Sequence, residues 1–183
     1  MILIPPIEWV RIESELDTRK QILKEYILPF VIVYTICSFT GASLFSLQPY
    51  SITLITLKTI ISALFIIGGI YLSAVIINEL AISFGIHKNL DSTFKLVTYS
   101  STSFFIAICL VGLLPDMPIF LILALHSIYL FWIGTSVILK TPETNKVGFV
   151  VVSLLIIVGI YAIFSLIVGT VVTGMIYVSQ PIL

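Results

Sequence analysis

The sequence predicts an all-α fold: a polytopic membrane helix bundle with five transmembrane helices and an N-terminal amphipathic interfacial helix. Three observations lead to this prediction. Hydrophobic residues make up 59% of the 183 residues and charged residues only 10%, too little polar surface to cover a soluble core of this size. The charges cluster at the ends of long apolar runs. Five of these runs are long enough to cross about 30 Å of hydrocarbon as helices.

The N-terminal region is predicted to be a cytoplasmic amphipathic segment, residues 1–25, ahead of a five-span membrane domain, residues 26–183. Its apolar residues can share one helical face, with the charged residues elsewhere. That face consists of Trp9, Ile12, Leu16 and Leu23. We expect the segment to lie on the membrane with Trp9 as its interfacial anchor, either only to orient the first crossing or also to bind a partner. The charge-dense start lacks the apolar region of a cleavable signal peptide.

Five spans follow in order, joined by short polar connections. The expected spans are Ile27–Leu47, Ser51–Phe84, Phe94–Leu114, Ile119–Leu139 and Val147–Val178. The connections are Gln48–Tyr50, Gly85–Asp91, Pro115–Pro118 and Lys140–Lys146. Pro29 stands in the first turns of the first span, where proline is tolerated, and Gly85 stands where a helix C-terminus favours glycine.

The second span is the element around which we expect the others to pack. As a helix it is about 50 Å long, against about 30 Å of hydrocarbon, so it crosses with turns to spare. One face is mostly small or polar at helical spacing, and small residues let helix backbones approach closely in lipid. This face consists of Lys58, Ser62, Phe65, Gly69, Ser73, Ile76 and Ser83. Small residues at 40–43, and Ser165 with Gly169, predict further close helix contacts.

The lysines and arginines predict the orientation. Eight of the nine fall before the first span, or in or next to the connections that share its side of the membrane, and only Lys58 falls on the other side. The N-terminus is therefore expected in the cytoplasm and the C-terminus outside. Net charge is zero and the sequence has no basic run, which argues against nucleic acid as a partner.

A candidate intramembrane polar site combines six residues in or at the ends of spans, where ionisable groups are costly and often functional. They are Asn78, Glu79, Tyr99, Ser100, His126 and Tyr129. Glu79 is either paired with a nearby lysine or snorkelling at the interface, or it is a substrate or proton site. His126 is either hydrogen-bonded to a neighbouring hydroxyl or carbonyl, or a ligand. Lys58 and Asp116 form a candidate outer ion pair, worth about 0–1 kcal/mol if exposed.

Motifs for enzymes and metal sites are largely missing from the sequence. Cys37 and Cys109 fall within spans and are expected to be free thiols that behave as small hydrophobic residues. Since the spacings typical of zinc hydrolases, phosphate-binding loops and Cys/His metal sites do not occur, we predict no cofactor and no catalytic residue. The nearest enzyme-like arrangement is Ser43 with His126 as its base, in which Leu44 replaces the glycine expected after the serine.

Several short motifs point to a known family. They are Trp9-Val-Arg-Ile12-Glu13, Tyr26-Ile-Leu-Pro29, Asn78-Glu79, Phe84-Gly85-x-His-Lys88-Asn89, Lys95-Leu-Val-x-Tyr99-Ser100, Leu114-Pro115, Ser127-Ile-Tyr129-Leu-Phe-Trp132-x-Gly134 and Lys140-Thr-Pro142-Glu143. In this order and spacing they resemble prokaryotic members of the YIP (Ypt/Rab-interacting-protein) family of five-span membrane proteins. One departure is Ser103, which stands where the family usually has a proline after the Tyr-Ser-x-Thr stretch, and this leaves open whether the third span bends there.

The resemblance implies a role in membrane organisation or trafficking, and a bacterial inner (plasma) membrane as the location. It does not carry small-GTPase binding to this chain, because the long cytosolic N-terminal region of eukaryotic relatives is missing. Three hypotheses follow. The first is a non-enzymatic protein that acts in the lipid bilayer through a membrane-protein partner, a second copy of the chain or a lipid. The second is a small channel or carrier that uses Glu79 and His126, and the third is a hydrolase that uses Ser43.

Overall fold

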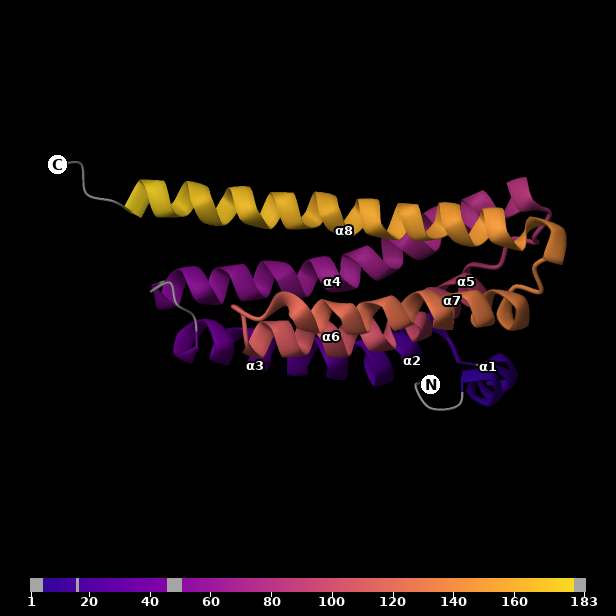
Figure 1. The fold of residues 1–183 in the computed structure, drawn as a ribbon, viewed down its shortest axis with the longest axis horizontal. Helices are drawn as coiled ribbons and strands as arrows, with labels where there is room; N and C mark the ends of the chain where they lie inside the picture. Colours follow the sequence, from indigo (N-terminus) through magenta and orange to yellow (C-terminus); the bar gives the residue numbers. More distant parts are fainter. Residues whose placement is uncertain (1–4, 16, 46–50, 180–183) are drawn as a thin grey trace.

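The computed structural model describes residues 5–15, 17–45 and 51–179, and every regular element in these ranges is a helix (Figure 1). In chain order the elements are α1 (Pro5–Ser14), α2 (Arg19–Ile22), η1 (Leu23–Ile27), α3 (Leu28–Leu44), α4 (Ile52–Leu80), η2 (Ala81–Phe84), α5 (Leu90–Ser100), α6 (Thr102–Leu113), η3 (Pro118–Ala124), α7 (Leu125–Ile138) and α8 (Glu143–Ser179). Of the short elements, η1 is a π-helix, whereas η2 and η3 are 3-10 helices.

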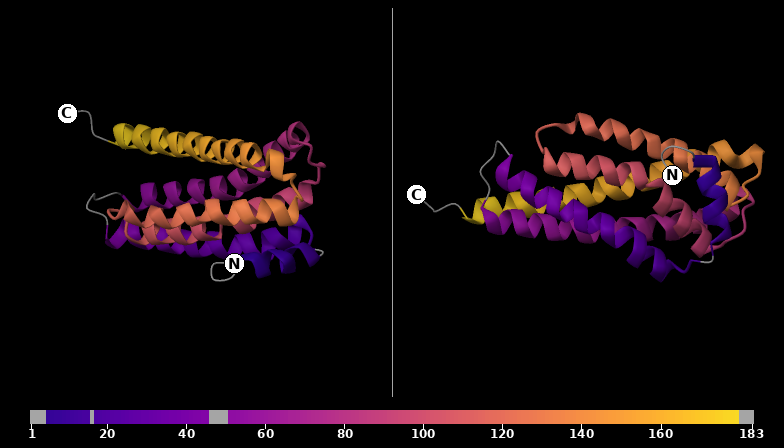
Figure 2. Two further views of the ribbon diagram at one scale, coloured as in Figure 1. Left: turned by 45° about the vertical axis from the view of Figure 1, so that its right-hand side comes forward. Right: turned by 90° about the horizontal axis from the view of Figure 1, so that it is seen from below.

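The helices make up the predicted membrane bundle. Four stretches are long and apolar enough to cross a membrane: Arg19–Leu44, Ile52–Phe84, Pro118–Ile138 and Glu143–Gly174. The pair α5 and α6 passes the same test as one bent span, which brings the number to five. The five segments run side by side along the long axis, and successive segments run in opposite directions (Figures 1 and 2). The all-α polytopic fold predicted from composition is confirmed.

Some ends of the spans differ from the expected ones, and others agree with them. Helix α8 begins at Glu143, four residues earlier than expected. The fourth span opens as a 3-10 helix of 7 residues before it becomes α-helical. Helix α4 begins where the Ser51 hydroxyl accepts the backbone N–H of Leu54 at 3.3 Å, and η2 ends at Gly85, whose φ of 71° confirms the predicted glycine stop. The expected connection Gln48–Tyr50 lies outside the described residues.

The third span bends by 44° between α5 and α6, although no proline is present there. The cause is a run of hydroxyl side chains that donate to carbonyls one turn earlier, an arrangement known to bend helices. Ser100 Oγ donates to the carbonyl of Leu96, Ser101 Oγ to that of Val97, and Thr102 Oγ1 to that of Tyr99. The sequence leaves open whether the third span bends at this point, and the structure shows that it does.

Helix α4 is central, as predicted, and packs against α3, α5 and α8. A Cβ at Gly69 would lie 2.9 Å from the ring of Tyr161, so the absent side chain lets that tyrosine of α8 lie on α4. Ser73 is also buried, whereas Ile76 and Ser83 of the same predicted face are exposed. The predicted packing face is therefore correct only in the middle of the helix, from Phe65 to Ser73, because Lys58 at its start is exposed as well.

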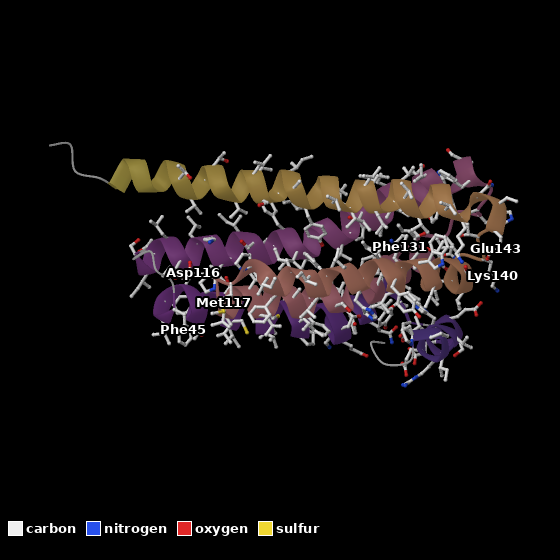
Figure 3. The ribbon with its side chains drawn as sticks, viewed as in Figure 1. Phe45, Asp116, Met117, Phe131, Lys140 and Glu143 are labelled. Atoms are coloured by element: carbon white, nitrogen blue, oxygen red, sulfur yellow. The ribbon has the colours of Figure 1, made fainter. Side chains whose placement is uncertain are left out.

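The two ends of the bundle differ in character (Figure 3). The charged end comprises α1, α2, η2, the starts of α5 and α8, and the loops at 85–89 and 139–142; Lys140 and Glu143 lie there. The apolar end comprises the end of α3, the start of α4 and the turn at 114–117; Asp116 and Met117 lie there. In Figure 2, α1 lies across the bundle axis at the charged end.

Candidate functional site

Trp9 holds helix α1 against the bundle. This position contradicts the prediction that Trp9 is an anchor in the membrane interface. The side chain is 0% exposed and lies over Gly134 of α7. A Cβ at Gly134 would sit 2.5 Å from Trp9 Cζ2 and 2.7 Å from Leu96 Cδ1, so glycine is needed for the tryptophan to fit. Trp9 and Ile12 of the predicted apolar face are buried against protein, whereas Leu16 lies outside the described residues. Ile7 and Val10 remain exposed at 66% and 59%.

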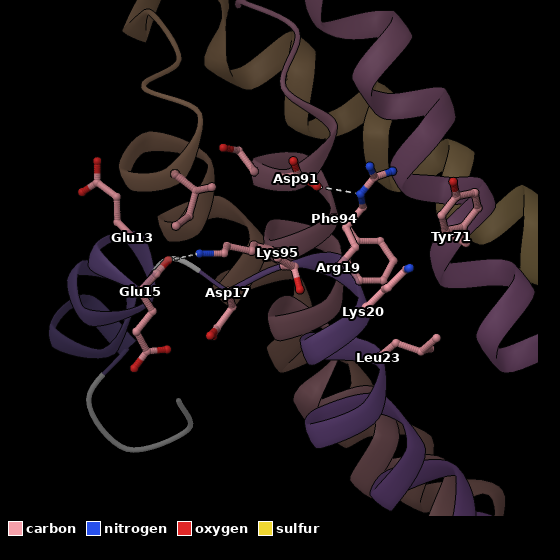
Figure 4. Close-up of a pocket in the computed structure, with 13 residues that line it drawn as sticks. Glu13, Glu15, Asp17, Arg19, Lys20, Leu23, Tyr71, Asp91, Phe94 and Lys95 are labelled. Carbon is pink, nitrogen blue, oxygen red and sulfur yellow. Dashed lines mark hydrogen bonds and ion pairs between the residues drawn. The ribbon is translucent and has the colours of Figure 1, made fainter.

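Lys95 fixes the end of α1 to α5. Although it carries a charge, the residue is only 8% exposed. Its Nζ donates to the carbonyl of Ile12 at 3.3 Å and to the carbonyl of Glu15 (Figure 4). A cation at the C-terminus of a helix also opposes the negative end of the helix dipole. Lys95 therefore supplies the hydrogen bonds that the last carbonyls of α1 cannot find within the helix.

Ion pairs join further segments at this end. Lys140 Nζ lies 2.9 Å from Glu13 Oε1, which links the loop after α7 to α1. Arg19 Nε lies 2.6 Å from Asp91 Oδ1, which links α2 to the first turn of α5. The side chain of Asn89 accepts two backbone N–H groups and so starts α5 beside this pair.

The start of α8 is tied to the same region. Asn145 Nδ2 donates to the carbonyl of Phe84 at 3.0 Å, which holds the first turn of α8 against the end of η2. Lys146 Nζ lies 4.6 Å from the ring centroid of Trp132 on α7, a cation–π contact. These contacts and those of Lys95 bring parts of several family motifs together at the charged end, whereas Leu114-Pro115 lies at the apolar end.

A cavity of about 830 Å³ opens at the charged end (Figure 4). Residues of both charges line it, together with Thr18, Leu23, Tyr71, Ser92, Phe94 and Ile138. The charged residues are Glu13, Glu15, Asp17, Arg19, Lys20, Asp91 and Lys95. Glu13, Arg19, Asp91 and Lys95 make the contacts given above, and Glu15 pairs with Arg11 at 3.1 Å. Within the described part of the chain, Asp17 and Lys20 have no ion-pair partner.

The residues of the predicted polar site fall into separate local contacts. Asn78 is buried and accepts the hydroxyl of Thr93 at 3.4 Å. Glu79, next along α4, is paired with Lys88, and its side chain is 64% exposed. Of the two alternatives for Glu79, the surface ion pair is the geometry that the structure contains.

The other predicted site residues lie further along the bundle. The ring of Tyr99 packs 4.6 Å from the ring of Tyr26, and the hydroxyl of Ser100 bonds to its own helix. His126 packs 5.5 Å from the ring of Tyr129 on the same helix. Among the described residues, His126 Nε2 is buried without a hydrogen-bond partner.

The remaining predictions concern the apolar end. Lys58 lines a second cavity with Pro115, which precedes Asp116, so both charges of the predicted outer pair lie at the same end; the pair itself stays a prediction. Ser43 is exposed on α3, whereas His126 lies on α7 against Tyr129. Cys37 and Cys109 are free thiols, as expected.

Sequence reasoning missed the residues that build the charged end. Lys95 enters the predicted topology and a family motif but not the predicted polar site, although it stands inside the expected third span, where a charge is costly unless it has partners. Gly134 belongs to a family motif, but its role depends on a tryptophan more than a hundred residues away, which local spacing does not reveal. Asp17 and Lys20 are ordinary charged residues in a charged segment and give no signal of their own.

Comparison with known protein families gives a match to the chain. The sequence model of the Yip1 domain matches residues 2–177, almost the whole chain. No curated protein and no solved structure matches the chain. The match covers α1, the charged end and the five spans. The chain belongs to the Yip1-domain (YIP) family of integral membrane proteins.

Proposed function

We propose that this chain is a non-enzymatic membrane protein that acts in membrane organisation or trafficking by binding a protein or lipid partner at its charged end. The charged end faces the cytoplasm in this proposal, since eight of the nine lysines and arginines belong to that side. The cavity of about 830 Å³ is the observation that carries the proposal.

The construction of this cavity supports partner binding. Its walls come from α1, α2, α4, α5 and α7, and the contacts of Trp9 and Lys95 fix α1 in place. A preformed site loses little conformational freedom when a partner binds. Asp17 and Lys20, unpaired within the described chain, are available to form charge-assisted hydrogen bonds with a partner, which would give specificity as well as affinity.

No specific observation favours the channel or carrier. Glu79 is an exposed, paired residue near the end of its helix, and His126 contacts a tyrosine of its own helix. We therefore propose no second function.

The test is to purify the full chain from its native membrane in a mild detergent and to quantify proteins and lipids that co-purify in fixed ratio. The same is done for the double variant Asp17→Ala/Lys20→Ala, which leaves the net charge unchanged. If the cavity binds the partner, the partner should be lost from the double variant while the protein elutes at its usual position in size exclusion.

The matched control is Glu25→Ala/Lys24→Ala, because both residues are exposed on η1 just beyond the cavity lining and also form a charge-neutral pair of substitutions. The control should retain the partner. If the same amount of partner co-purified with both double variants, the cavity would not be the binding site. A chain that purifies alone and carries solute flux in proteoliposomes would overturn the proposed function.

A further inference from the structure

A second cavity lies at the other end of the molecule, within the membrane-spanning region. It has a volume of about 630 Å³ and is bounded by α3, α4, α6 and α8. Most of its lining is apolar or aromatic, but it also carries several hydroxyl groups and one charged residue. The polar members are Tyr34, Ser38, Lys58, Ser62, Tyr161, Ser165 and Thr173.

The cavity extends inward from Lys58 along the membrane-spanning direction. On α4 its lining runs from Lys58 to Ile66, which is about 12 Å of helix at 1.5 Å per residue. At its inner limit the rings of Phe65 and Phe164 stack with centroids 4.4 Å apart, and the hydroxyl of Tyr161 donates to the carbonyl of Ile66 at 3.4 Å. The inner limit is therefore fixed by contacts between α4 and α8.

Lys58 gives this cavity its chemistry. The other eight lysines and arginines are assigned to the opposite side of the membrane, so Lys58 is the lysine or arginine assigned to this side. It is exposed, one turn and a half into α4, at the depth at which a lysine can extend its ammonium group to lipid phosphates. Ser62 stands one turn further in and adds a hydroxyl group below the cation. Asp116 also lies at this end and has an interaction within the chain.

We propose that this cavity binds an anionic phospholipid, with an acyl chain between α4 and α8 and the phosphate at Lys58. The opposite charges of phosphate and ammonium favour this occupant over a second copy of the chain, because a symmetric contact at this surface would bring two Lys58 side chains together. The apolar wall accepts the acyl chain, and the hydroxyls can donate to the ester oxygens of the glycerol group. The site is independent of the cavity at the charged end.

The experiment uses the full chain in a mild detergent, equilibrated with an equal mixture of phosphatidylglycerol and phosphatidylcholine. After size exclusion, the lipids that remain bound are extracted and quantified by mass spectrometry. The native chain should retain phosphatidylglycerol preferentially. Lys58→Gln should lower the ratio of bound phosphatidylglycerol to phosphatidylcholine about five-fold, the contribution expected of one lysine to binding an anionic lipid.

A second variant tests the cavity itself. Gly169 lines the cavity, and a Cβ there would meet open space, so Gly169→Phe fills the cavity without a backbone clash and should remove most of the retained lipid. Gly174→Phe is the matched control, since Gly174 also faces open space on α8 but does not line the cavity. It should retain lipid as the native chain does.

Three outcomes would overturn the proposal. The first is a phosphatidylglycerol preference that Lys58→Gln leaves unchanged or that Lys24→Gln, at the opposite side, lowers equally. The second is equal lipid retention by Gly169→Phe and Gly174→Phe. The third is a dimer in native mass spectrometry that Gly169→Phe dissociates. Asp116→Asn should retain or raise the preference, because it removes a negative charge from the end of the molecule at which the phosphate binds.

Discussion

The two ends of this bundle differ in how their segments are joined. At the charged end, segments far apart in the sequence are joined by specific contacts: Trp9 with Gly134, Lys95 with the end of α1, and Lys140 with Glu13. At the apolar end, α8 lies along α4 (Figure 1). A cavity of about 630 Å³ at this end is bounded by α3, α4, α6 and α8. The cavity at the charged end is lined mostly by charged and polar residues, whereas the cavity at the apolar end is lined mostly by apolar and aromatic ones.

This difference teaches where each end can act. The contacts at the charged end hold a fixed shape, which a partner can recognise without reordering the protein. The apolar end has free space between helices at membrane depth, which in a bilayer is filled by lipid or by another helix. Glycines show that the open space lies along α8. A side chain at Gly134 would collide with the ring of Trp9, and a Cβ at Gly41 of α3 would collide with the carbonyl oxygen of Gly112 on α6. A side chain at Gly159, Gly169 or Gly174 of α8 would instead meet open space.

The largest expected effect comes from Trp9→Ala. Removing a fully buried tryptophan costs about 3–5 kcal/mol in typical proteins, and here the loss falls on the docking of α1. We expect α1 to detach, so that limited trypsin digestion cleaves after Arg11 far faster than in the native chain. The control is Val10→Ala, because Val10 is exposed on the same helix. Equal digestion of the two variants would show that Trp9 does not hold α1.

A smaller effect is expected from Gly134→Val. The new side chain would overlap with Trp9 and Leu96, and overpacking of this kind costs about 1–3 kcal/mol. Gly159→Val introduces the same side chain on α8, where a Cβ meets open space, and should leave the thermal unfolding temperature nearly unchanged. The double variant Trp9→Ala/Gly134→Val should be less destabilised than the sum of the two single variants, because the overlap is removed. Additive effects would contradict direct packing of Trp9 on Gly134.

Much of the fold could be predicted from the sequence, because a bilayer dictates the length and composition of each span. The position of the stop at Gly85 follows equally from local chemistry. The bend at Ser101 was left open because a missing proline removes the usual signal, while hydroxyl side chains bond back to a helix in some settings and not in others. Local patterns reveal which residues are apolar or charged, but not what they touch.

Trp9 and Glu79 show that local patterns do not reveal the contacts of the candidate site either. An amphipathic pattern predicts an apolar face without saying whether lipid or protein covers it, so Trp9 was assigned to the membrane and is instead buried against α7. Glu79 falls at the end of a long apolar run, and only the path of the loop after η2 decides whether Lys88 reaches it. Residues joined across the fold, such as Lys95 and the carbonyl of Ile12, leave no trace in local spacing.

The smallest expected effect is that of Glu79→Gln, which tests whether the charged end also houses a transport site. The pair with Lys88 is exposed, and exposed ion pairs contribute about 0–1 kcal/mol, so unfolding should shift little. Asn78→Ala changes the neighbouring residue of α4, which is buried and hydrogen-bonded to Thr93, and should destabilise the chain more. Ion flux into proteoliposomes should be the same for the native chain and Glu79→Gln. A flux present in the native chain and abolished by Glu79→Gln would instead make the carboxylate part of a permeation pathway, and the charged end would then serve transport rather than partner binding.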